Sequence, residues 1–172
     1  MPGKTVRDWT IIADALSFAL SERRFMATNS DESRQFTISI DCVKDLELRV
    51  KFDNPSHPDL MMDEPAPAGQ DAAPNPSRMV AAAVGGCLSA SLLFSARKLR
   101  LNIQGLHSEV TVQHTRNEKG RLRIGKINVE ITPNIQEPDP QKLQRCLDLF
   151  EDYCVVTQSV RKGIDVAVTV KH

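Results

Sequence analysis

The sequence predicts an α+β fold in which a mainly antiparallel sheet covers buried helices. Two observations lead to this prediction. Apolar and polar residues alternate in pairs of short segments joined by turn signals, so hairpins dominate over parallel crossovers. Two apolar segments with helical spacing separate these pairs. The predicted order is helix, two strands, proline-rich loop, helix, two strands, helix, strand.

The N-terminal part begins with a predicted helix over roughly 9–24, where apolar residues fall on one helical face. The polar run at 29–33 then predicts a loop. Alternation over 36–40 and again over 46–52 predicts two strands. The intervening residues 43–45 form their connection, so these strands are expected to make a hairpin.

The segment 53–76 contains six prolines, which break regular structure. We expect an ordered, proline-stiffened loop, because Asn75 and Pro76 lead directly into a helix as its N-cap and first residue. The helical stretch 79–96 is long and uncharged, as a membrane span would be. Its glycines and serines, with no second span following, favour a buried core helix. The basic run 97–100 predicts its C-terminus.

The second half predicts a further hairpin, with strands around 110–112 and 127–131 and a turn at 117–120. Asp139 is the expected cap of a second helix that Gly163 ends. Alternation over 164–170 predicts a final strand. The apolar face of the second helix is expected to contain Leu143, Leu147, Phe150 and Cys154.

Composition argues against several classes of protein. The 172 residues include 22 Lys+Arg and 22 Asp+Glu, so the net charge favours neither nucleic acid nor a membrane as partner. The N-terminus has no apolar signal core, and four cysteines are too few for a disulfide scaffold. We therefore expect a cytoplasmic protein with reduced thiols. The histidines show no metal-ligand spacing with each other or with the cysteines, so no metal site is expected.

Cys87 and Cys154 are the candidate reactive residues. They lie in the two helical segments, which must pack into one core, so the fold can assemble a dithiol without a CxxC turn. Each could instead be a small buried apolar residue. Cys146, two helical turns before Cys154, is either core or a rival second thiol, and Cys42 is expected to be incidental.

The other polar candidates are not expected to form a catalytic site. His57 is expected to be a surface loop residue. Asp63 and Glu64 are adjacent and would face apart in an extended chain, which is poor geometry for a paired-carboxylate site. We expect Glu64 to fix the loop instead. The sequence contains no Gly-rich phosphate loop, no G-x-S-x-G and no HExxH.

Taken in order, these segments resemble the OsmC/Ohr family of thiol peroxidases. The resemblance covers about residues 36–172, taken as one domain, and leaves 1–35 as an N-terminal helical extension. It rests on four features: His57-Pro58 followed by Asp63-Glu64-Pro65, Asn75-Pro76 opening an Ala-rich helix, Gly85-Gly86-Cys87 inside that helix, and Tyr153-Cys154-Val155-Val156-Thr157.

The resemblance implies an intertwined homodimer, with sheets built from both chains around two central buried helices that carry the cysteines. It implies that Cys87 attacks a peroxide and becomes a sulfenic acid, and that Cys154 condenses with it to a disulfide. External thiols or dithiols then reduce the pair, so no bound cofactor is needed. Organic hydroperoxides are the implied substrates.

The chain departs from the family pattern where the thiolate is activated. In the family an arginine does this, held by a glutamate that follows Asn-Pro; this chain has Ser77 there, and Val155 replaces the proline after the second cysteine. Arg49 is the candidate arginine and Arg34 the alternative, although Arg49 could instead be a solvated strand position. A cationic group is needed because Cys87 lies too deep in its helix to benefit from the dipole, and burial raises the pKa of a thiol.

Two functions therefore remain open. The first is a thiol-dependent peroxidase using Cys87 and Cys154 with Arg49. The second is a non-catalytic OsmC-fold protein that binds a small apolar or acyl ligand at the dimer interface. A third, weaker alternative is a dimeric interaction module. Charge around Cys87 discriminates between the first two, because an inert cysteine needs only apolar surroundings.

Overall fold

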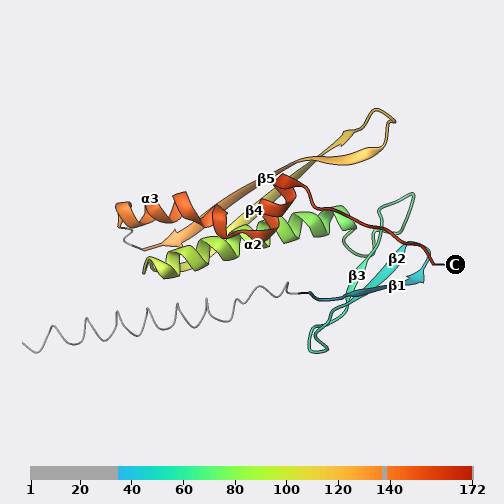
Figure 1. The fold of residues 1–172 in the computed structure, drawn as a ribbon, viewed down its shortest axis with the longest axis horizontal. Coiled ribbons are helices and arrows are strands. Elements are labelled where there is room, and N and C mark those ends of the chain that lie inside the picture. The colour runs from blue at the N-terminus through green and yellow to red at the C-terminus, as the bar shows by residue number, and fades with distance from the viewer. Residues whose placement is uncertain (1–34, 137–138, 172) are drawn as a thin grey trace, which may run out of the picture.

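The computed structural model describes residues 35–136 and 139–171. The helix predicted over 9–24 and the loop at 29–33 lie outside the described residues. The described chain contains a three-stranded sheet, a long helix, a long two-stranded hairpin and shorter C-terminal helices (Figure 1). Both sheets are antiparallel, so the α+β prediction is confirmed.

The small sheet has the order β1 (Ser39–Lys44), β2 (Glu47–Lys51), β3 (Leu60–Met62). The predicted β1–β2 hairpin is confirmed, and Asp45 makes its tight turn with a positive φ of 51°. β1 begins at Ser39, later than the alternation indicated. β3 was not predicted, because prolines lie on both sides of it; they flank the strand without interrupting its three pairs with β2.

The proline-rich loop is ordered, as predicted, but Asp63 fixes it more than Glu64 does. Asp63 is 3% exposed, and its carboxylate accepts the backbone N–H groups of Glu64, Gln70 and Ala72. These bonds, led by that from Ala72, hold the pKa of Asp63 below its usual range despite burial. The Glu64 carboxylate accepts one longer bond, 3.4 Å from Asn75 Nδ2.

The central helix α2 (Pro76–Lys98) forms where it was predicted. The side chain of Asn75 accepts the N–H of Arg78 at 3.0 Å and caps the helix, and the last turn carries the expected basic residues. By length and composition alone α2 could span a membrane. Its face of Val84, Leu88, Leu92 and Ala96 is buried in the fold, as expected for a core helix.

The strands β4 (Ile103–Arg116) and β5 (Leu122–Ile135) form a long hairpin that runs along α2 (Figure 1). Its turn lies where predicted, and Gly120 has the positive φ of 71° that the turn requires. Gly85 lets β4 approach α2 closely, because a Cβ there would collide with the side chain of Val110. The apolar face of β5 then packs on the α2 core.

The second predicted helix is divided in two. α3 (Pro140–Leu149) starts at its predicted cap, Asp139, and passes into a single 3-10 turn, η1 (Phe150–Tyr153). Cys154 then has extended dihedral angles, φ −84° and ψ 95°, before α4 (Val155–Lys162). The prediction that Cys154 lies inside a helix is therefore wrong. It is the N-cap of α4, a role that apolar spacing does not reveal.

Gly163 ends α4 as predicted, with a φ of 78°. The strand predicted at 164–170 is not found, since residues 163–171 have no ladder partner in the described part of the chain. Its apolar side chains are nevertheless exposed, with 82% exposure at Val170. An apolar segment of this pattern buries itself only against another strand.

Candidate active site

The fold brings together the two cysteines that the sequence singled out. Cys154 is fully buried and forms a core cluster with Val84 and Leu88, against which Cys87 packs. Both are free thiols, and each shifts the pKa of the other. α2 therefore supplies one thiol and the start of α4 the other, as the predicted dithiol required.

Cys154 is held by the first turn of α4. The N–H of Thr157 donates to the Cys154 sulfur at 3.4 Å, and the Thr157 hydroxyl oxygen lies 3.0 Å from the same sulfur. Thr157 is itself buried. Unpaired N–H groups give the beginning of a helix a partial positive charge, which stabilises an anion there. The geometry therefore favours negative charge on Cys154.

The two thiols have opposite pKa shifts. Burial raises the pKa of Cys87 and the neighbouring Cys154 raises it further, whereas the Val156 N–H lowers it. Burial is also the largest single influence on Cys154, but the neighbouring Cys87, Thr157 and Ser91 together outweigh it and lower its pKa. The surroundings therefore favour a thiolate more at Cys154 than at Cys87.

Ser91 and Thr157 are site residues that the sequence analysis missed. Ser91 lies one helical turn after Cys87, is 5% exposed, and its hydroxyl stabilises the thiolate form of both cysteines. Thr157 follows Cys154 by three residues, which is the spacing of an N-cap and its bonded N–H. That spacing is the signal that could have identified Thr157.

Arg49 does not join the dithiol within one chain. It lies in β2 with its Nε 3.9 Å from the carboxylate of Asp59, and both side chains are nearly half exposed. Arg34 lies outside the described residues. Ser77 lines a separate hollow with Arg78, whose guanidinium pairs with Asp71 at 2.8 Å. The described groups that favour a thiolate are therefore N–H and hydroxyl groups.

The remaining candidates lie apart from the pair. Cys146 is fully buried in a second cluster with Leu92 and Ala96, and burial raises its pKa. Cys42 is exposed on β1, and His57 is exposed with its ring edge against Phe52. Among the described residues no cluster of His, Cys, Asp and Glu could hold a metal ion.

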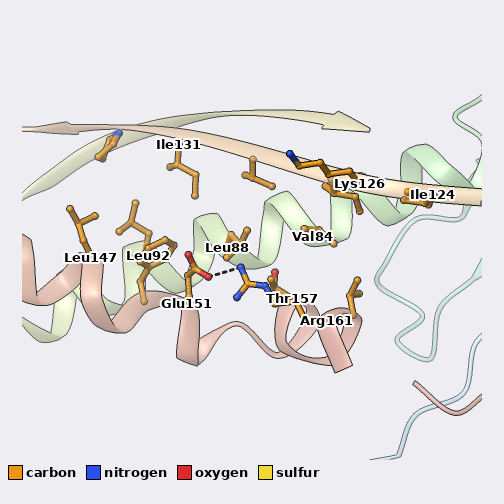
Figure 2. A pocket seen from close by; sticks show the side chains of 16 residues that line it. Val84, Leu88, Leu92, Ile124, Lys126, Ile131, Leu147, Glu151, Thr157 and Arg161 are labelled. Carbon is orange, nitrogen blue, oxygen red and sulfur yellow. Dashed lines mark ion pairs between the residues drawn. The ribbon is translucent and has the colours of Figure 1, made fainter. Parts of the chain in front are cut away.

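A cavity of about 580 Å³ lies between α2, β5 and the α3–α4 segment (Figure 2). It shares Val84, Leu88 and Thr157 with the surroundings of Cys154. Most of its lining is aliphatic, and an ion pair of 2.7 Å joins Glu151 and Arg161 along its edge (Figure 2). Apolar walls with a few charged groups suit a ligand that has an apolar body and a polar end.

Comparison with known proteins identifies related chains. A family model described as OsmC-like protein matches residues 69–169, which is more than half of the chain. No curated protein matches. An OsmC-like protein of unknown function from Vibrio cholerae is 16% identical, with a TM-score of 0.64 over 74% of this chain and 94% of that one.

Two further solved structures have the same fold. The organic hydroperoxide resistance protein OsmC of Legionella pneumophila is 13% identical, with a TM-score of 0.56 over 77% of this chain and 93% of that one. The organic hydroperoxide resistance protein OhrB of Bacillus subtilis is 22% identical, with a TM-score of 0.52 over 76% and 94%. At these identities the likeness establishes the fold.

Proposed function

The chain belongs to the OsmC-like protein family, and we propose that it is a thiol-dependent peroxidase that reduces organic hydroperoxides with Cys87 and Cys154. The observation that carries the proposal is the packing of Cys87, from α2, against the buried cluster that contains Cys154, at the start of α4. A structural cysteine needs only apolar neighbours. The polar groups of Ser91 and Thr157 around this pair are those that a reactive thiolate needs.

In this proposal the partly exposed Cys87 attacks the peroxide, and the buried Cys154 resolves the product. The Cys87 sulfur bonds to one peroxide oxygen and the O–O bond breaks. The alcohol departs, and Cys87 is left as a sulfenic acid. Cys154 then attacks the Cys87 sulfur and expels water, which forms the disulfide. The two thiols supply both electrons, and an external thiol or dithiol restores them without a bound cofactor.

We further propose that the active form is a homodimer in the cytoplasm. The chain leaves apolar side chains exposed on β1 and along the unpaired segment 164–170, including Ile40 at 52% and Val168 at 80%. Strand exchange with a second copy would bury both. Arg49 stays a prediction as the activating residue, because within one chain it lies beside Asp59 and not at the dithiol.

A second function is favoured by the cavity beside Cys154. Its aliphatic lining and volume of about 580 Å³ suit a small apolar or acyl ligand. In that case the cysteines are inert, and binding of a fluorescent fatty-acid analogue by the protein would not change after both are replaced by serine.

The test is consumption of cumene hydroperoxide by the full chain with dithiothreitol as reductant. We expect turnover that is lost in Cys87→Ser and retained in Cys42→Ser, since the exposed Cys42 lies outside the site. Turnover that persists in Cys87→Ser would contradict the assignment. Absence of turnover in the unmodified protein, together with ligand binding, would favour the second function.

A further inference from the structure

We propose that the tip of the β4–β5 hairpin, residues 116–126, is a docking surface for an anionic lipid bilayer. The partner is a surface of phospholipids with net negative charge, and neither a nucleic acid nor an acidic protein. This inference goes beyond the proposed function and does not depend on it, because docking needs neither cysteine. The strand exchange proposed above uses β1 and the segment 164–170 and does not use this tip.

The tip carries a local excess of positive charge that the net charge of the whole chain conceals. Residues 116–126 contain five Lys and Arg residues and one acidic residue, Glu118, in a chain whose formal net charge is +0. Four of the five are exposed and line one shallow hollow together with Glu118: Arg116, Lys119, Arg121 and Arg123. Within the described ranges 35–136 and 139–171, none of these four forms an ion pair. The hollow therefore attracts an anion.

The turn holds these cations in place before any partner binds. The side-chain oxygen of Asn117 accepts the backbone N–H of Lys119 at 3.1 Å and that of Arg121 at 2.9 Å. The Arg116 guanidinium donates to the Gly120 carbonyl oxygen at 2.7 Å. An arginine bound in this way keeps further N–H donors for a phosphate group. Because the groups of the site are already ordered, less entropy is lost on binding.

Exposed aliphatic side chains lie between the arginines and favour a bilayer over a nucleic acid. Leu122 is 53% exposed and Ile124 is 37% exposed. They alternate with Arg121 and Arg123 in the sequence. Aliphatic groups beside cations suit the boundary between lipid headgroups and acyl chains. Single-stranded nucleic acids are instead bound by aromatic side chains on which the bases stack, and residues 116–126 contain no Phe, Tyr or Trp.

The position of the tip allows it to reach a flat surface. Figure 1 shows the turn between β4 and β5 projecting away from α2 and from the C-terminal helices. Ile124 and Lys126 of β5 also line the cavity of about 580 Å³ between α2, β5 and the α3–α4 segment (Figure 2). The aliphatic cavity therefore begins next to the surface that faces the lipid.

The test is sedimentation of the full chain with lipid vesicles at low and at physiological ionic strength. One set of vesicles contains phosphatidylcholine alone, and the other contains added phosphatidylserine. We expect the protein to sediment only with the anionic vesicles, and less at the higher ionic strength, because salt screens the attraction between surface charges. No sedimentation with anionic vesicles at either ionic strength would overturn the proposal.

A pair of double variants tests which cations bind. Arg121→Gln with Arg123→Gln should weaken vesicle binding by about 25-fold, at about fivefold for each basic side chain near an anionic bilayer. The matched control is Arg97→Gln with Arg145→Gln, which removes the same charge from exposed helical positions near the other end of the hairpin. The control should bind as the unmodified protein does. Equal weakening in both double variants would overturn the assignment to the tip.

Leu122→Ser distinguishes a bilayer from a soluble polyanion as the partner. Because it removes an exposed aliphatic group and no charge, it should weaken vesicle binding by about tenfold, and Leu122→Ile should restore it. Unchanged binding in Leu122→Ser would overturn the bilayer as partner. Tight binding of a single-stranded oligonucleotide that anionic vesicles do not displace would also overturn it, and would assign the tip to nucleic acid.

Vesicle binding and peroxide reduction are separable in these experiments. Sedimentation needs no peroxide, and Cys87→Ser should bind vesicles as the unmodified protein does. If the protein binds anionic vesicles but consumes no cumene hydroperoxide, the peroxidase assignment fails and the docking surface stands. If it consumes the peroxide but does not bind the vesicles, the docking surface fails and the peroxidase assignment stands.

Discussion

Cys154 and Thr157 form a cap in which sulfur takes the place of the usual oxygen acceptor. The Thr157 N–H donates to the Cys154 sulfur at 3.4 Å, and this contact opens α4. The same residue belongs to the buried cluster against which Cys87 packs. One residue thus ends the η1 turn, starts α4 and completes the dithiol, so local folding and reactivity are linked at Cys154.

The cap predicts different stabilities for two substitutions of Cys154. Cys154→Ser should keep the cap, because serine is a strong N-cap residue, whereas Cys154→Ala should lose it. We expect the alanine variant to have a free energy of unfolding about 1 kcal/mol lower than the serine variant. Urea denaturation of both under reducing conditions measures the difference, and equal midpoints would contradict the capping role.

The glycine pair in α2 predicts opposite effects at adjacent positions. A Cβ at Gly85 would collide with the side chain of Val110, whereas a Cβ at Gly86 meets nothing within 4 Å. Gly85→Ala should therefore destabilise the protein by about 1–3 kcal/mol through overpacking. Gly86→Ala should stabilise it by about 0.5–1 kcal/mol, because alanine is the better helix former. Thermal unfolding of the two variants provides a matched comparison.

Asp63 predicts a loss of stability in acid. Three backbone N–H donors lower the pKa of Asp63 in the folded state. Its contribution to the free energy of unfolding is therefore complete above the unfolded-state pKa and is lost as pH falls through the folded-state pKa. Asp63→Asn should lower the melting temperature at pH 7. The gap between variant and unmodified protein should narrow below about pH 4, the unfolded range of an aspartate. A gap independent of pH would contradict this role.

The buried Cys146 thiol predicts a loss of stability at high pH, opposite to the effect of Asp63. Burial raises the pKa of Cys146 in the folded state. Its contribution to the free energy of unfolding is therefore complete below the unfolded-state pKa and is lost as pH rises through the folded-state pKa. Cys146→Ala should reduce the loss of stability above about pH 8.5, the unperturbed thiol range. It should leave Cys87 reactivity unchanged, because Cys146 lies in a different cluster. Altered Cys87 alkylation would instead support Cys146 as the rival thiol.

Local signals in the sequence predicted much of this fold. The caps Asn75 and Asp139 and the turns at Gly120 and Gly163 were identified because each uses a short-range backbone interaction. Cys87 packs against the cluster that contains Cys154, as expected of two apolar segments that must share a core.

The failures arise where a wider context decides the structure. Apolar spacing continues through Cys154, so the break before α4 was hidden until its sulfur was found to accept a helix N–H. Ser91 has no motif of its own, and only the approach of α4 to α2 gives it a role. The strand expected at 164–170 needs a ladder partner, which the described residues do not supply.

The most direct test of the peroxidase dithiol is to map disulfides by mass spectrometry after the fully reduced protein receives one equivalent of cumene hydroperoxide. We predict rapid, stoichiometric formation of a single Cys87–Cys154 bond, which Cys87→Ser abolishes. Absence of oxidation, or slow oxidation spread over all four cysteines, would contradict the account and leave the apolar cavity as the functional feature to pursue.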